Sequence, residues 1–286
     1  MAKSGKNYGF MHGLRKFLLN AKDLSKLNRK VIKNPDSRLV LILSFPRSGT
    51  HALASMIDHK EFGLLYYGEF FMFNHWSPMV ERLNKFIPFF SWRFYINNRR
   101  QRRKWTTFRF EQTTLDVFKT LDAMLAFPGT HIVKLFPEHL HLETLGQVLS
   151  KYKPHVIILR RNHLDRYVSL KKANASGKWH KVNSSEIQVD IDKKELMHYV
   201  NKYDDWYKKV KKSAHGCPIL DIGFEKLHDA ATVSKIQEFI LLDKKDVNSL
   251  PKSPTTTKMD KSSKIQEDFL TASNMSLADF NFVEIS

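Results

Sequence analysis

Short apolar runs alternate along the chain with longer segments that have the periodicity of helices. The mostly apolar runs are residues 39–43, 131–137, 156–159 and 219–222. Runs of this length suit strands that are buried on both faces of a sheet. Apolar residues recur at helical spacing in residues 52–57, 113–127 and 138–151. This alternation predicts an α/β fold with a central, mostly parallel sheet flanked by helices on both faces, in a three-layer sandwich.

The two ends of the chain depart from this pattern. Residues 1–37 are basic and polar, with apolar positions at helical spacing, so we expect an N-terminal basic helical segment. Residues 38–250 would form the main domain, with an aromatic and basic insertion around residues 73–112. Residues 251–286 begin with Pro, Lys, Ser and Thr, which predicts a C-terminal loop and tail.

Composition and charge limit the classes of function. A chain of 286 residues with 42% hydrophobic and 12% aromatic residues can form a folded domain with a sizeable core. Its 47 Lys and Arg residues outnumber 29 Asp and Glu residues, which gives a formal net charge of +18. So basic a chain implies an anionic partner, such as a nucleic acid, a membrane surface, an acidic polymer, or a phosphorylated or sulfated ligand.

Cysteine content and hydrophobicity exclude other classes. The single cysteine, Cys217, excludes an intramolecular disulfide, and no C-x-x-C motif or His/Cys cluster indicates zinc. We therefore expect no metal. No apolar run approaches the length of a transmembrane helix, and the first 20 residues lack the apolar core of a secretory signal. These patterns predict a cytoplasmic protein without a transmembrane segment.

The strand predicted at residues 39–43 leads into a turn rich in groups that bind anions. Residues 44–51 read Ser-Phe-Pro-Arg-Ser-Gly-Thr-His and precede the first predicted helix. Amides at a helix N-terminus point at a ligand, and the helix dipole favours an anion there. Gly49 lets the backbone come close, while Ser48 and Thr50 offer hydroxyls. The simpler interpretation is a helix capped by Ser48 or Thr50, but a cap has no use for the cation of Arg47.

Three cations fall at or near the ends of predicted strands. Arg47 follows the first strand, Lys134 lies within the second, and Arg161 follows the third. A lysine in an apolar strand is costly to bury unless it is paired or meets a ligand. Ligands of parallel sheets bind beyond the carboxyl ends of the strands, so these cations predict one anion site. Ser169 lies eight residues after Arg161, about two turns into the next helix. A helix that pairs its own charges, such as Asp165 with Arg161, is the alternative.

These two segments together resemble the sulfotransferase family. The run from Pro46 to Thr50 is similar to the family's 5′-phosphosulfate loop, P-[RK]-S-G-T, and His51 follows it. The segment from Arg161 to Ser169 is similar to the family's 3′-phosphate pattern, in which that Arg and Ser contact the phosphate. The resemblance covers about residues 38–230. It implies a P-loop NTPase-like sandwich and the donor 3′-phosphoadenosine 5′-phosphosulfate (PAPS), with 3′,5′-bisphosphoadenosine (PAP) as product and no metal.

Two weaker resemblances extend the candidate site. Phe224-Glu225-Lys226-Leu227 is similar to the family's Tyr-Glu-x-Leu, whose aromatic residue lies near the adenine, so Phe224 is a candidate cofactor contact that lacks the hydroxyl. In the family a basic C-terminal segment closes over the 3′-phosphate and adenine. This implies that the tail packs on the cofactor site, with Lys258 as the first candidate and Lys261 and Lys264 as others.

The catalytic base is expected to be a carboxylate. Gly68-Glu69 resembles the Gly-Glu of tyrosylprotein and several bacterial sulfotransferases, where Glu is the base. The Lys-Thr-His base motif of cytosolic sulfotransferases is absent, since Phe136 stands where the histidine would be. Glu69 lies among aromatic residues and is the first candidate, whereas Glu138 and His139 are alternatives.

The resemblance implies transfer of a sulfuryl group to a hydroxyl or amine. Arg47 and Lys134 would stabilise charge on the leaving phosphate, and Glu69 would take the acceptor's proton. A P-loop nucleotide or small-molecule kinase is the alternative, but it would require a Gly-Lys-Ser/Thr ending and a magnesium-binding carboxylate. A nucleic-acid-binding module would explain the charge but not the Arg161 and Ser169 spacing, so we expect no nucleic acid partner.

The acceptor is left open. A saccharide, a peptide tyrosine, a lipid and a small phenol or alcohol all satisfy the chemistry. The basic run from Arg99 to Lys104 lies between two presumed site segments. It is either a solvated loop or an electropositive rim that holds an anionic acceptor.

Overall fold

A computed structural model describes residues 33–69, 71, 114–177, 187–241 and 264–282. Its centre is a five-stranded sheet in which every strand pairing is parallel, with the order β2-β3-β1-β4-β5. The strands are β1 (Ser37–Leu43), β2 (Leu64–Tyr66), β3 (Gly129–Leu135), β4 (His155–Arg160) and β5 (Ile219–Gly223). The parallel sheet confirms the predicted α/β class. It also places the turn that follows β1 at the middle of the sheet.

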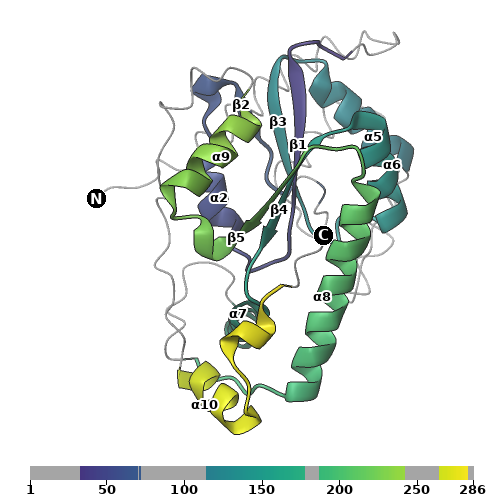
Figure 1. Cartoon of the computed structure of the whole chain (residues 1–286). Helices are drawn as coiled ribbons and strands as arrows, with labels where there is room; N and C mark the ends of the chain where they lie inside the picture. Colours follow the sequence, from purple (N-terminus) through teal and green to yellow (C-terminus); the bar gives the residue numbers. More distant parts are fainter. Residues whose placement is uncertain (1–32, 70, 72–113, 178–186, 242–263, 283–286) are drawn as a thin grey trace.

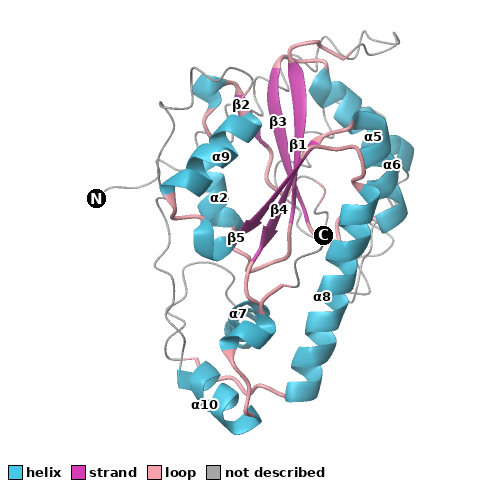
Figure 2. Ribbon diagram, viewed as in Figure 1, coloured by secondary structure: helices cyan, strands magenta, loops and turns pink. Residues whose placement is uncertain are grey.

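Helices cover both faces of this sheet (Figures 1 and 2). One face carries α2 (Thr50–Ile57) and α9 (Ala230–Ile240), and the other carries α5 (Thr114–Leu125), α6 (Leu142–Tyr152) and α8 (Lys193–Ser213). Alternate residues of β1 serve the two layers: Val40 and Ile42 join the α2 and α9 side, while Leu39, Leu41 and Leu43 join the other. Because both faces are covered, the strand is apolar at every one of these positions.

Further helices lie beyond the carboxyl ends of the strands. They are α7 (His163–Ser176), α10 (Lys264–Ser273) and the short turn η5 (Leu277–Phe280). A small apolar cluster joins them to α8 through Leu164, Val200 and Phe280. Figure 1 shows α7 and α10 at this end of the molecule, so the C-terminal part of the described chain packs beside the start of α7. The remaining short turns are η1 (Lys60–Phe62) and η3 (Phe224–Lys226).

The predicted elements agree with the structure except at their ends. The helix predicted over residues 138–151 begins only at Leu142. Residues 137–140 form a turn instead, closed by a 2.9 Å bond from His139 N to Phe136 O. The three-residue strand β2 and the helices α8, α9 and α10 are additional elements. In the described part of the chain, no helix combines the length and apolar character that crossing a membrane requires.

The predicted domain boundaries fall partly outside the described residues. These contain neither residues 1–32, with most of the predicted N-terminal helix, nor residues 72–113, where the insertion was expected. The exact limits of the main domain therefore stay a prediction.

Candidate active site

The turn between β1 and α2 is a tight loop pinned to the neighbouring strand. Ser44 Oγ donates a 2.7 Å hydrogen bond to the carbonyl of Leu159 in β4. Two residues of the loop have left-handed backbone angles, Arg47 with φ 70° and Gly49 with φ 84°. A left-handed arginine is uncommon and is strained unless its surroundings hold it. The loop therefore depends on neighbouring contacts to keep this shape, and it lies at the middle of the sheet edge because β1 is the central strand.

Gly49 is required both by its backbone angle and by close packing. A Cβ atom added at this position would lie 2.0 Å from Cδ2 of Phe224, which comes from the η3 turn after β5. Gly49 is also the N-cap of α2, and no side chain caps that helix. The simpler interpretation, in which Ser48 or Thr50 caps α2, is therefore wrong. Ser48 is fully buried, and its Oγ has no hydrogen-bond partner in the described part of the chain.

Lys134 lies next to the start of α2 and is paired with Glu69. In the sheet register Lys134 is opposite Ile42, so its side chain is directed to the α2 face. Its Nζ lies 2.6 Å from Oε1 of Glu69 and donates a 3.3 Å hydrogen bond to Oγ1 of Thr50. Burial lowers the pKa of Lys134 from its ordinary value, and the nearby carboxylate of Glu69 opposes that shift. The ion pair satisfies the expectation that a buried lysine has a partner.

Glu69 reaches this position from the turn after β2. The carbonyl of Gly68 accepts a 2.9 Å hydrogen bond from the amide of Lys134, which fixes the turn against β3. The side chain of Lys134 is 4% exposed, whereas that of Glu69 is 28% exposed. The carboxylate is therefore accessible from outside the protein, while the ammonium is covered. The structure thus brings Glu69, Lys134 and Thr50 together at one side of the loop.

The two motifs found in the sequence meet at the other side of the loop. Arg47 Nε donates a 2.9 Å hydrogen bond to Oγ of Ser169, and Arg161 Nη1 donates a 3.2 Å bond to the carbonyl of Arg47. The Arg161 guanidinium lies over the ring of Phe224, with 4.8 Å from its carbon to the ring centroid. One cluster thus contains two arginines, Arg47 and Arg161, together with Ser169, which lies 122 positions after Arg47. Because the Arg47 side chain contacts Ser169, this arginine reaches the Arg161 side of the loop.

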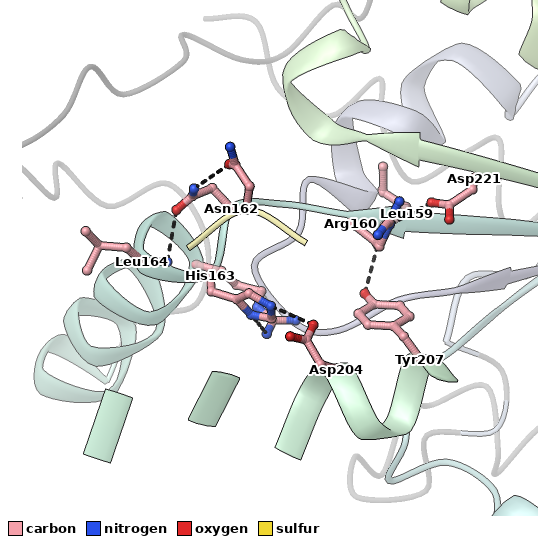
Figure 3. Close-up of polar contacts among 10 residues, drawn as sticks. Leu159, Arg160, Asn162, His163, Leu164, Asp204, Tyr207 and Asp221 are labelled. Carbon is pink, nitrogen blue, oxygen red and sulfur yellow. Dashed lines mark hydrogen bonds and ion pairs between the residues drawn. The ribbon is translucent and has the colours of Figure 1, made fainter. Parts of the chain in front are cut away.

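The start of α7 is held by several hydrogen bonds of Asn162. Its side chain caps the helix by accepting from the amide of Leu164 at 3.0 Å, as Figure 3 shows. The same side chain donates to the carbonyl of Leu277 at 3.0 Å and to Oδ1 of Asn281 at 2.9 Å. Its backbone amide donates to Oε1 of Glu225 at 3.1 Å. The residue that follows Arg161 is therefore fixed by η3 and by the C-terminal segment.

A second set of polar contacts ties α7 and β4 to α8 and β5. His163 Nε2 lies 2.9 Å from Oδ1 of Asp204 in α8, and Tyr207 of α8 donates to the carbonyl of Leu159 at 3.1 Å (Figure 3). Arg160 pairs with Asp221 of β5 at 2.7 Å. Adjacent arginines thus have different surroundings, since Arg160 meets β5 and the following Arg161 meets the loop.

Arg166 is a buried cation that sequence analysis did not single out. Its side chain is fully buried, and its guanidinium carbon lies 4.2 Å from the ring centroid of Tyr203 and 4.7 Å from that of Phe45, the residue before Pro46. Nη2 lies 3.2 Å from Nδ1 of His163, whereas Nε and Nη1 make no hydrogen bond within the described residues. Aromatic faces therefore supply much of this cation's stabilisation.

The two alternative bases differ from Glu69. His139 is buried, and its Nδ1 accepts a 3.2 Å hydrogen bond from the amide of Phe136. Burial lowers the pKa of His139 to about 4. A neutral ring that accepts at Nδ1 carries its hydrogen on Nε2, so it has no second nitrogen that can accept a proton. Glu138 is exposed in the turn after β3.

The remaining predicted contacts have varied positions. Pro46 is half-buried in the loop, and His51 is exposed on the first turn of α2. Lys258, Lys261 and the basic run from Arg99 to Lys104 lie outside the described residues. Lys264 is exposed at the start of α10, and this helix meets α7 where Gln266 Nε2 donates to Oδ1 of Asp165 at 2.5 Å.

Comparison with known families identifies the class of protein. The model of the sulfotransferase domain family matches residues 37–276, from the first residue of β1 to just before η5. The chain therefore belongs to the sulfotransferase family and is a transferase. The match favours sulfuryl transfer over the kinase alternative. A search of curated proteins gives no match.

Proposed function

We propose that this protein transfers the sulfuryl group of PAPS to a hydroxyl or amine of an acceptor and releases PAP. The observation that carries the proposal is the arrangement around one loop. Arg47 contacts both Ser169 and Arg161 on one side, and on the other Lys134 contacts both Glu69 and Thr50. Such an arrangement suits a ligand that carries anionic groups at two positions.

The loop has the features needed to hold a phosphosulfate. The N-terminus of α2, which no side chain caps, and the buried Ser48 hydroxyl suit an anion. Pro46 to His51 would therefore hold the 5′-phosphosulfate.

Arg161 and Ser169 would hold the 3′-phosphate. Ser169 accepts a hydrogen bond from Arg47 through its oxygen, which leaves its own hydroxyl hydrogen to donate to a phosphate oxygen. Arg161 offers several N–H groups in one plane, an arrangement that matches a phosphate. Lys258 is proposed as a further contact on the basis of the family resemblance alone.

Lys134 and Arg47 would stabilise the leaving group. As the bond between sulfur and the bridging oxygen breaks, negative charge collects on the phosphate. The ammonium of Lys134 has three N–H donors, of which Glu69 and Thr50 take two, so one donor is left for that oxygen. Because the ammonium is buried, its interaction with a nearby anion is weakly screened.

Glu69 would act as the general base. Its carboxylate contacts Lys134 through Oε1 and is partly exposed, so an acceptor can approach it. The acceptor oxygen attacks sulfur as its proton passes to the Glu69 carboxylate, and the pair of electrons of the broken sulfur–oxygen bond leaves with PAP. Holding Glu69 and Lys134 in contact places the proton acceptor beside the group that stabilises the leaving charge.

Binding of PAP tests this function directly. Isothermal titration calorimetry without magnesium should show PAP binding, and Arg161→Ala should weaken it by 10-fold or more. Arg160→Ala is the matched control: Arg160 pairs with Asp221 and not with the loop, so its removal should leave PAP affinity within about twofold. Mass spectrometry of a panel of saccharide, peptide and phenol acceptors with PAPS then identifies the acceptor. Stabilisation by ATP with magnesium, without binding of PAP, would favour the kinase and reject the proposal.

A further inference from the structure

Phe224 lies where the two halves of the candidate site meet. Its ring is 4% exposed. A Cβ atom placed at Gly49 would lie 2.0 Å from Cδ2 and 2.3 Å from Cε2 of this ring, so the ring is packed directly against the loop backbone. The guanidinium of Arg161 lies over the same ring, 4.8 Å from its centroid. One side chain therefore contacts both the loop and the arginine proposed for the 3′-phosphate.

The contact with Phe224 orients Arg161. A cation is attracted to the face of an aromatic ring, and the attraction grows as water is removed. When a ring holds a guanidinium by its flat face, the N–H groups point outward at the edge, and Nη1 of Arg161 donates there to the carbonyl of Arg47. The ring thus reduces the number of orientations that Arg161 can adopt without using any of its hydrogen-bond donors.

The residue after Phe224 fixes the backbone beside Arg161. Glu225 accepts a hydrogen bond from the amide of Asn162 at 3.1 Å, so the short η3 turn contacts both the Arg161 side chain and the amide that follows it. A turn that only closed β5 would require neither contact. Stacking of an adenine on Phe224 would require an open ring face. The exposed fraction of 4% leaves almost none.

We propose that Phe224 is a positioning residue that orients Arg161 and thereby sets the preference for a ligand with a 3′-phosphate. This inference rests on the proposed function, since it assumes that Arg161 binds that phosphate. It differs from the role that the family resemblance implies for the aromatic residue, which is a contact with the adenine.

The test compares two ligands that differ only in the 3′-phosphate. Calorimetry gives the affinity of the full chain for PAP and for adenosine 5′-phosphate, and the ratio of the two affinities is the readout. Phe224→Leu should reduce this ratio by about 3- to 30-fold, the range of a desolvated cation–aromatic contact. Phe224→Tyr keeps the ring face, so its ratio of affinities should equal that of the wild type. Leu227→Val, a buried apolar change in the same turn, should leave the ratio unchanged.

A double-mutant cycle with Arg161→Ala separates the explanations. If Phe224 acts through Arg161, Phe224→Leu has no further effect on the ratio once Arg161 is removed. Equal losses for both ligands, or losses that add in the double mutant, would overturn the inference and favour an adenine contact. If Phe224→Leu does not fold, Phe224→Met retains more side-chain length and carries the same expectation. A wild-type chain that binds both ligands equally would instead reject the proposed function.

Discussion

Replacement of Gly49 by alanine is expected to damage both stability and ligand binding. Gly49 has φ 84°, a left-handed angle that costs a residue with a Cβ atom about 1–2 kcal/mol. The new Cβ would also lie 2.0 Å from the Phe224 ring, well inside van der Waals contact. Forcing extra atoms into a packed core costs about 1–3 kcal/mol. Gly49→Ala should therefore lower the free energy of unfolding by about 2–5 kcal/mol.

Gly177 provides a matched control for the backbone angle alone. It ends α7 with φ 63°, and an added Cβ would meet no atom of the described residues within 4 Å. Gly177→Ala should cost only the left-handed angle, about 1–2 kcal/mol. Urea denaturation followed by circular dichroism measures both variants. The difference between them, about 1–3 kcal/mol, is the contribution of the Phe224 contact.

Equal losses in the free energy of unfolding of the two alanine variants would refute a close contact between residue 49 and the Phe224 ring. A second check uses Phe224→Leu, which removes part of the ring. In that background the extra cost of Gly49→Ala over Gly177→Ala should shrink, because the two positions are in contact and their effects are not additive. An unchanged difference would mean that the ring does not hold the loop.

Three further predictions concern ionisable groups near the site. Glu69→Gln should lower kcat by roughly 10²–10⁴-fold with little change in PAP affinity; the exposed Glu138→Gln is its control, and a Glu69→Gln variant that keeps most of its kcat would reject the base. The pKa of His139 is about 4 when folded and 6.5 in the unfolded chain, so stability should fall as pH drops from 6.5 to about 4. His139→Asn should remove about 3 kcal/mol of that fall in urea titrations at several pH values, and identical pH profiles would contradict it. The free energy of unfolding of Arg166→Met should lie within about 1 kcal/mol of the wild-type value, because apolar contacts replace a poorly hydrogen-bonded cation. Arg166→Ala should lower the free energy of unfolding clearly more in the same assay.

The part of the fold with strong local signals could be predicted from the sequence. The run Leu39–Leu43 is apolar at every position because helices cover both faces, and this is readable without a structure. The strand β2 has three residues, too few to show any period. The helix α8 could have been found, because Leu196, Val200, Tyr203, Tyr207 and Val210 recur at helical spacing and are its buried residues.

The anion site could be predicted in outline but not in its pairings. Arg47, Lys134 and Arg161 were expected together because parallel strands end at one edge of the sheet. The contact between Lys134 and Glu69 follows from the position of β2 beside β3, which no local pattern encodes. The same holds for Phe224, since a packing contact with Gly49 depends on the sheet order and not on spacing along the chain.

The contacts of Asn162 determine when the start of α7 can be fixed during synthesis of the chain. Its partners Leu277 and Asn281 lie 115 and 119 positions later in the sequence. A ribosome that adds about 5–20 residues per second needs roughly 6–24 s to reach Asn281 after Asn162. During that interval the emerging chain holds the β1 loop and Arg161 without two of the residues that contact Asn162. The contacts of Asn162 with Leu277 and Asn281 therefore form only after synthesis has passed Asn281.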